Sequence, residues 1–174
     1  MNFSTPRLII TPFTENHADA FLDFYNKDLV MKFVGNGSFN WTKEQLLLKI
    51  SKLFADELFA DELFGVHTIQ LTETKEIIGE FSVFKIDDET DKVEIGYIMN
   101  DQYWNKGYAT ELIKGFLISL QNQNTIKTVT ARVNSENKAS IHICKSLGFI
   151  ITDTKVVNDK TQITLEYLII IKNL

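Results

Sequence analysis

A short segment at residues 104–110 combines residue types that bind phosphate. Gly107 and Ala109 stand where a helix is expected to begin, and Lys106 precedes them. The first turn of a helix has backbone N–H groups without helical partners and a partial positive charge, so it attracts anions. Small side chains let a phosphate reach that backbone, and Lys106 adds a cation. The spacings of a P-loop and of a Rossmann motif are absent here, which leaves a helix-start phosphate site or an ordinary helix start.

A second polar segment lies downstream, from Asn134 to Ser140, and is followed by Ser146-Leu147-Gly148-Phe149. Together the two segments resemble the acetyl-CoA-binding motifs of the GCN5-related N-acetyltransferases (GNAT superfamily). The strand-like residues 93–100 are similar to the same family, and so is the opening Thr5-Pro6-Arg7-Leu8. This opening, with Tyr103-Trp104 before the first segment, resembles the branch that contains the ribosomal-protein N-terminal acetyltransferases. The resemblance covers nearly the whole chain in the expected order.

The resemblance implies that acetyl-CoA is the co-substrate. The loop before the helix would hold the pyrophosphate. The end of the strand at 92–99 would pair with the pantetheine arm, and one backbone N–H there would polarise the thioester carbonyl. Trp104 stands where many members have Gln or Arg, so one familiar phosphate contact is missing. The residues assigned to acetyl-CoA are Ile98, Met99, Asn100, Trp104, Asn105, Lys106, Gly107, Tyr108, Ala109, Thr110 and Asn137.

The same resemblance points to Glu94 as the general base. The attacking amine must be neutral, and at pH 7 an α-amino group is about 10% neutral while a lysine side chain is well under 1% neutral. A carboxylate that accepts the proton therefore helps either acceptor. Glu94 lies where the family's strand often carries its base glutamate. The structural alternative is an ordinary glutamate on the surface of a strand.

Protonation of the leaving thiolate is where this sequence departs from the wider family. Many members have a general-acid tyrosine seven residues after the asparagine of the second motif, and Cys144 occupies that position. Ser140, which stands where the ribosomal-protein branch has a serine, becomes the expected donor to the sulfur. Loss of the acid slows the reaction without abolishing it, because a thiol of pKa about 8.5 leaves tolerably unaided and a positioned acid adds about 10²–10⁴-fold. Alternatively, Ser140 is a helix-start hydroxyl and Cys144 a core thiol.

Composition and charge limit the other function classes. The chain has 174 residues, 44% hydrophobic and 24% charged, which is typical of one soluble domain spanning residues 1–174. The net charge of −5 argues against a nucleic-acid partner. Residues 1–100 carry a net charge of −8 and residues 101–174 a net charge of +3, which suits a cationic acceptor and an anionic ligand respectively. The three histidines show no metal spacing, and a single cysteine excludes a cysteine-built zinc site.

The chain shows no secretory leader and no apolar run of 18 residues, so we expect a cytoplasmic protein with no membrane partner. Short polar turns between the strands predict antiparallel pairing. We therefore expect a mixed α/β (α+β) fold: a single GNAT-like domain whose mostly antiparallel central sheet is flanked by helices. The sheet would be splayed between residues 93–99 and 126–133 to admit acetyl-CoA. The predicted strands are 7–13, 66–72, 77–86, 92–99, 126–133, 149–157 and 162–172, and the predicted helices are 15–26, 29–34, 42–63, 107–120 and 138–147.

One feature of the long predicted helix is unusual. The residues Leu53 to Glu57 are repeated directly at Leu58 to Glu62. Five residues turn a helix by about 500°, so the two copies are rotated about 140° from each other and cannot share a face. The repeat either lengthens a surface helix or adds an apolar stripe for dimerisation or for the substrate site.

The sequence thus predicts an acetyl-CoA-dependent N-acetyltransferase that acts directly on a primary amine, such as a protein N-terminal α-amine. A small-molecule amine (polyamine, amino acid or antibiotic) is the alternative acceptor, and a non-catalytic acyl-CoA-binding regulatory module is the alternative class. The acidic N-terminal half suits a cationic acceptor. The protein is expected to be a monomer or a homodimer.

Overall fold

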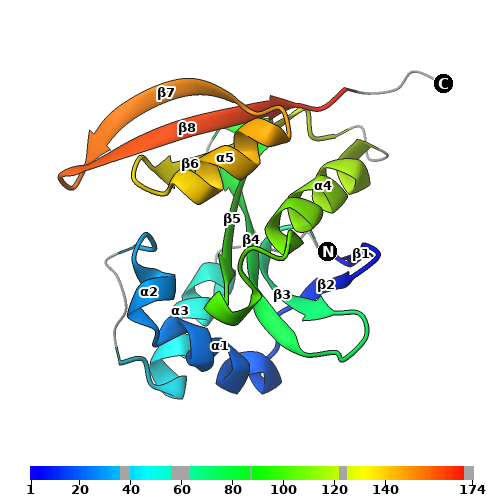
Figure 1. Ribbon diagram of the computed structural model, residues 1–174, viewed down its shortest axis with the longest axis vertical. Coiled ribbons are helices and arrows are strands. Elements are labelled where there is room, and N and C mark those ends of the chain that lie inside the picture. Colours follow the sequence, from blue (N-terminus) through cyan, green and yellow to red (C-terminus); the bar gives the residue numbers. More distant parts are fainter. Residues whose placement is uncertain (36–39, 56–62, 87, 122–124, 171–174) are drawn as a thin grey trace. The chain divides into compact units, whose positions relative to one another are not determined.

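The computed structural model describes residues 1–35, 40–55, 63–86, 88–121 and 125–170 (Figure 1). Eight strands form one sheet in the order β1-β2-β3-β4-β5-β6-β8-β7. Pairing is antiparallel for β1-β2, β2-β3, β3-β4, β6-β8 and β7-β8, and parallel for β5-β6. The expected mixed α+β fold with a mostly antiparallel sheet is confirmed. Contacts group the chain into two compact units, residues 1–83 with 97–108 and residues 84–96 with 109–174. Strands β4 and β5 contribute to both units.

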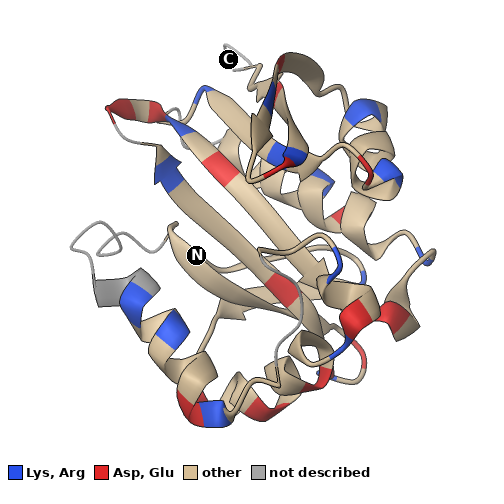
Figure 2. Ribbon diagram, turned by 90° about the vertical axis from the view of Figure 1, so that its left-hand side faces the viewer, with Lys and Arg blue, Asp and Glu red and all other residues tan. Residues whose placement is uncertain are grey.

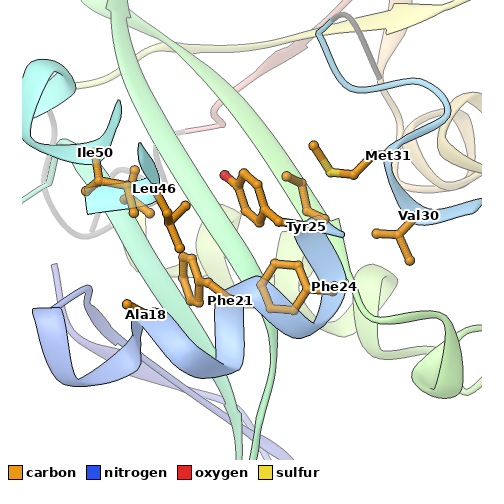
Figure 3. Packing of buried hydrophobic residues seen from close by; sticks show 10 residues of the cluster. Ala18, Phe21, Phe24, Tyr25, Val30, Met31, Leu46 and Ile50 are labelled. Atoms are coloured by element: carbon orange, nitrogen blue, oxygen red, sulfur yellow. The ribbon is translucent and has the colours of Figure 1, made fainter. Parts of the chain in front are cut away.

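The first unit is built on the N-terminal strands and helices. Its buried cluster is made by one face of α1, where Phe21, Phe24 and Tyr25 recur at helical spacing and pack against Leu46 and Ile50 of α3 (Figure 3). Thr14 is the N-cap of the 3-10 turn that precedes α1, and it forms a capping box with His17. The elements are β1 (Phe3–Ser4), β2 (Leu8–Pro12), η1 (Glu15–His17), α1 (Ala18–Tyr25), α2 (Asp28–Met31), α3 (Lys43–Ala55), β3 (Gly65–Leu71), most of β4 (Ile77–Ile86), the end of β5 (Glu89–Met99) and η3 (Asp101–Tyr103).

A polar group is buried in this apolar unit. The Glu80 carboxylate on β4 is 7% exposed and accepts hydrogen bonds from Tyr25 Oη at 2.5 Å and Ser82 Oγ at 2.7 Å. Lys49 Nζ donates to Tyr25 Oη at 3.2 Å and lies over the tyrosine ring. Burial, followed by the neighbouring carboxylate, raises the pKa of Tyr25, so the hydroxyl stays protonated and donates. Both oxygens of the buried carboxylate thus have a donor.

The second unit contains the C-terminal half. Its elements are α4 (Tyr108–Gln121, from Ala109 on), β6 (Thr128–Asn134), α5 (Lys138–Ser146), β7 (Ile150–Val157) and β8 (Lys160–Leu168). β5 pairs with β6 in parallel at three positions, from Lys92 opposite Thr128 to Glu94 opposite Thr130. The pairing ends there although both strands continue, as the expected splayed arrangement requires.

The structure differs from the predicted elements at their ends. Strand β1 was not expected, and its two residues extend the sheet beside β2. The helix expected to reach residue 63 is described to Ala55, and residues 56–62, which hold most of the repeated segment, lie outside the described residues. The last strand ends at Leu168, before the expected residue 172. In the part of the chain that the structure describes, no helix is long and apolar enough to cross a membrane.

Candidate active site

The segment expected to bind phosphate forms a loop that leads directly into α4. Asn105 and Gly107 have positive φ values of 58° and 80°, a conformation that glycine adopts without strain. Residues from Tyr108 onward are helical, so the N–H groups of the first turn, which includes Ala109 and Thr110, lack carbonyl partners within the helix. α4 has 14 residues, enough for its aligned peptide dipoles to favour an anion at this end.

Arg7, just before β2, contacts this loop, although it was not among the residues expected in the site. Its Nη1 donates to the carbonyl oxygen of Lys106 at 3.0 Å, and its guanidinium lies 4.5 Å from the ring centroid of Tyr108. A Cβ on Gly107 would lie 3.4 Å from Arg7 Nη2. Lys106 Nζ lies 5.0 Å from the ring centroid of Tyr103. Two cations, Arg7 and Lys106, therefore lie beside the loop. The sequence feature that pointed to Arg7 was the opening Thr5-Pro6-Arg7-Leu8.

The strand end before this loop already has several intrachain hydrogen bonds. The indole Nε1 of Trp104 donates to the carbonyl oxygen of Met99 at 2.7 Å, and the N–H of Asn100 donates to the carbonyl oxygen of Ile78 at 2.9 Å. The Asn100 side chain is buried, donates to Asp23 and accepts from Lys27. Trp104 thus ties the loop to the end of β5.

The end of β5 also approaches its neighbour β4 very closely. A Cβ at Gly79 would lie 2.3 Å from the carbonyl oxygen of Ile98 and 3.1 Å from Cα of Met99. Glycine is therefore required at this position of β4. The close approach fixes the backbone of Ile98 and Met99, two of the three residues expected, with Asn100, to pair with the pantetheine arm.

Glu94 lies in a groove on one face of the strands of the second unit. Its side chain is 16% exposed and forms an ion pair with Arg132, which is 47% exposed. The hydrogen bond from the guanidinium to this carboxylate raises the pKa of Arg132, so the arginine keeps its charge. The register explains the contact, because Glu94 faces Thr130 and successive side chains alternate between the two faces of a strand. Arg132 therefore shares the face of Glu94.

The groove has a volume of about 560 Å³ and carries mixed charge. It contains four cations and three carboxylates, and two of the carboxylates are in ion pairs: Glu94 with Arg132, and Glu166 with Lys92 at 2.7 Å. Acidic and basic residues occur on neighbouring strands of the sheet in Figure 2. Thr130 Oγ1 is buried with no hydrogen-bond partner among the described residues. The lining residues are Lys85, Ile86, Lys92, Glu94, Thr130, Arg132, Thr152, Asp153, Lys155, Thr164 and Glu166.

The second motif forms the start of α5. Asn137 is the N-cap of this helix, and its Oδ1 accepts a hydrogen bond from the N–H of Ser140 at 3.1 Å. Cys144 lies one turn further and is buried, and this burial raises the pKa of its thiol to about 11. The thiol is therefore neutral at physiological pH. Asn137 and Ser140 are thus brought together, but neither lines the groove of Glu94.

The described residues contain no group of three or more His, Cys, Asp or Glu side chains placed to hold a metal ion. The expected site residues therefore form three groups. The first is the loop with Arg7 and the end of β5, the second is the pair Glu94 and Arg132, and the third is the start of α5.

Comparison with known proteins agrees with the sequence resemblance. Residues 7–150 match the family model described as the acetyltransferase (GNAT) domain. An uncharacterized N-acetyltransferase, p20 of Bacillus licheniformis, is 33% identical over 82 residues, which cover 47% of this chain and 46% of the relative. The chain therefore aligns with less than half of that relative's length. The uncharacterized N-acetyltransferase YoaA of Bacillus subtilis is 25% identical over 146 residues, which cover 83% of this chain and 80% of the relative.

Solved structures share the fold at low sequence identity. A GNAT-family acetyltransferase from Bacillus anthracis has a TM-score of 0.82 at 21% identity, covering 97% of this chain and 98% of that one. A spermidine N-acetyltransferase from Vibrio cholerae, solved with CoA and spermine, has a TM-score of 0.78 at 15% identity, covering 95% and 97%. A ribosomal-protein-S5-alanine acetyltransferase from Vibrio fischeri has a TM-score of 0.75 at 15% identity, covering 97% of each chain.

Proposed function

The chain belongs to the GNAT acetyltransferase family, and on this premise we propose that it transfers the acetyl group of acetyl-CoA directly to a primary amine. The observation that carries the proposal is the loop before α4. Gly107 gives it a positive φ, the helix start supplies backbone N–H groups, and Arg7 and Lys106 supply positive charge. Such a loop fits a pyrophosphate. The V. cholerae neighbour, which was solved with CoA, supports the same co-substrate.

In this proposal the end of β5 receives the pantetheine arm. The carbonyl of Met99 and the N–H of Asn100 already have partners, so the arm pairs with the other backbone groups of Ile98 and Met99. An N–H in this stretch polarises the thioester carbonyl as negative charge develops on its oxygen. Trp104 and Asn100 hold the strand end in place and act as positioning residues.

Glu94 is the proposed base, and its ion pair with Arg132 defines how it would work. The carboxylate already binds a cation, and the partly exposed guanidinium is able to swing away when a positively charged amine arrives. The amine then passes one proton to Glu94 and attacks the thioester carbon. As the C–S bond breaks, the nitrogen loses its second proton to the departing CoA sulfur, so that an amide and the CoA thiol are formed. Ser140 donates a hydrogen bond to this sulfur. The buried thiol of Cys144 is a poorer donor because a thiol forms weak hydrogen bonds.

We propose a peptide α-amine as the acceptor, with a small polyamine as the alternative. The ribosomal-protein-S5-alanine acetyltransferase and the spermidine acetyltransferase share this fold with similar TM-scores, 0.75 and 0.78. The groove of Glu94 favours the peptide, because two of its three carboxylates are paired with Arg132 and Lys92. A polycation would need several carboxylates at once.

The test is steady-state transfer from acetyl-CoA to a peptide that begins with alanine, compared with spermidine. An α-amine is about 10% neutral at pH 7 and mostly neutral at pH 9, so Glu94→Gln should lose up to about tenfold more rate at pH 7 than at pH 9. Arg132→Gln breaks the same ion pair but keeps the carboxylate, so it should retain the wild-type pH profile. If each variant loses the same fraction of its rate at pH 7 and at pH 9, Glu94 is structural. If the protein binds CoA but acetylates neither amine, the non-catalytic module is favoured.

A further inference from the structure

Strand β7 forms an exposed edge of the sheet. It is the last strand in the sheet order, and all eight of its residues are exposed (Figure 1). Its apolar side chains are left in solvent, with Ile150 61%, Ile151 44%, Val156 70% and Val157 40% exposed. Edge strands are usually protected by being short, by proline, by a covering element, or by charged side chains and bulges. β7 has eight residues without proline, and among the described residues no strand pairs with its outer side.

The register against β8 shows which side chains of β7 share a face. A bulge at Thr152 interrupts the alternation, since Ile151 faces Leu165 while Asp153 faces Thr164. Beyond the bulge, Asp153 and Lys155 point to the groove face, and both line the groove. Ile150 and Val157 lie on this same face, because their partners on β8 are Glu166 and Lys160. Ile151, Thr154 and Val156 lie on the opposite face.

We propose that β7 pairs antiparallel with β7 of a second copy of this chain, around a twofold axis through Thr154. Asp153 then faces Lys155 of the second copy, and Lys155 faces the second Asp153. When the bulged residue Thr152 is left out of the count, Ile151 faces Val156 of the second copy and Ile150 faces its Val157. The two members of each pair lie on the same face of the sheet. The strand is therefore self-complementary in both charge and apolar contacts, as an isologous interface requires.

The alternative registers are poorer. When two copies of one strand pair antiparallel, the twofold axis is perpendicular to the sheet and passes between two identical residues that face each other. The registers next to the proposed one therefore have their axes at Asp153 or at Lys155. Each of these places like charges directly opposite each other, which is destabilising. The Thr154 axis alone among these three pairs the opposite charges. In the single chain the N–H of Thr154 donates to its neighbour Asp153 Oδ1 at 2.8 Å, and in the dimer it would donate to the facing Thr154 carbonyl.

Charge exchange tests the pairing. Sedimentation velocity over a micromolar concentration range should show a dimer for the wild type. Asp153→Lys and Lys155→Asp should each weaken dimerisation about tenfold or more, because each creates two like-charge pairs. An equimolar mixture of these two variants should dimerise again, since each supplies the charge that the other lacks. Glu136→Lys, an equal charge change at an exposed loop residue, should leave the dimer unchanged.

A cysteine scan tests the axis independently. Thr154→Cys places two thiols across the axis, where facing Cα atoms lie about 4.5–5.5 Å apart, within the range of a disulfide. Mild oxidation should therefore give a covalent dimer. Val156→Cys is the matched control, because the two Cα atoms would lie roughly 13 Å apart and should not cross-link. A monomeric wild type, a dimer that ignores both charge variants, or equal cross-linking at the two positions would overturn the proposal.

Discussion

The buried carboxylate of Glu80 makes the hydroxyl of Tyr25 a sensitive position for mutation. Tyr25→Phe removes one oxygen and keeps the ring, which is 2% exposed and packs against Phe21 and Phe24 (Figure 3). The apolar packing is therefore largely preserved. What is lost is the 2.5 Å hydrogen bond to Glu80 and the acceptor of the Lys49 ammonium.

The size of the effect follows from this burial. A hydrogen bond to a charged group contributes about 1.5–3 kcal/mol, and its loss leaves a desolvated oxygen without a donor. Ser82 remains on the other carboxylate oxygen, and Lys49 is held near by charge. We therefore expect the free energy of unfolding to fall by about 1.5–3 kcal/mol. For a chain of this size, that corresponds to a decrease in Tm of roughly 3–12 °C.

Urea unfolding followed by circular dichroism measures this change. Tyr167→Phe is a suitable control, because its half-buried ring keeps its contact with Phe149 and its hydroxyl is in no hydrogen bond described above. The control should shift stability by less than about 0.5 kcal/mol. In a double-mutant cycle, Glu80→Gln should reduce the effect of Tyr25→Phe. An unchanged stability in Tyr25→Phe, or full additivity with Glu80→Gln, would refute the view that this hydrogen bond stabilises the first unit.

Three further results are expected. Gly107→Glu should abolish measurable CoA binding in calorimetry, because glutamate is strained at this positive φ and adds a negative charge. The nearby control Gln102→Glu should weaken CoA binding by only a fewfold. Full CoA binding by the Gly107 variant would contradict the assignment of this loop to phosphate. Ser140→Ala should reduce single-turnover transfer more than Cys144→Ala, and the opposite order would assign the thiol as donor. Burial raises the pKa of Cys144 from 9.0 to about 11, so the stability that the neutral thiol contributes should be present below pH 9 and be lost as pH rises toward 11. In Cys144→Ala this loss of stability between pH 9 and 11 should be absent. The same dependence of unfolding free energy on pH in the wild type and in Cys144→Ala would contradict this prediction.

Part of the candidate site depends on short-range geometry, and the sequence predicted that helices begin near Gly107 and at Lys138. Asn137 caps α5 through the amide of Ser140, three residues away, and this contact needs only the local turn. The start of α4 after Gly107 is likewise local, because a glycine with positive φ and the first helical turn follow one another along the chain. The apolar face of α1 follows from its spacing.

The tertiary structure decided the contacts between distant residues. Arg7 reaches Lys106 across 99 positions, and Glu94 finds Arg132 because one parallel register places them on the same face. Periodicity shows which face of a strand is polar but not which strand lies beside it, and a shift of one residue would reverse the faces. The bulge at Thr152 had no signal in the sequence, and it shifts the alternation of side chains along β7. The backbone geometry of the loop before α4 was therefore local information, while the partner of the proposed base and the exposed edge of β7 arise only when the strands pair.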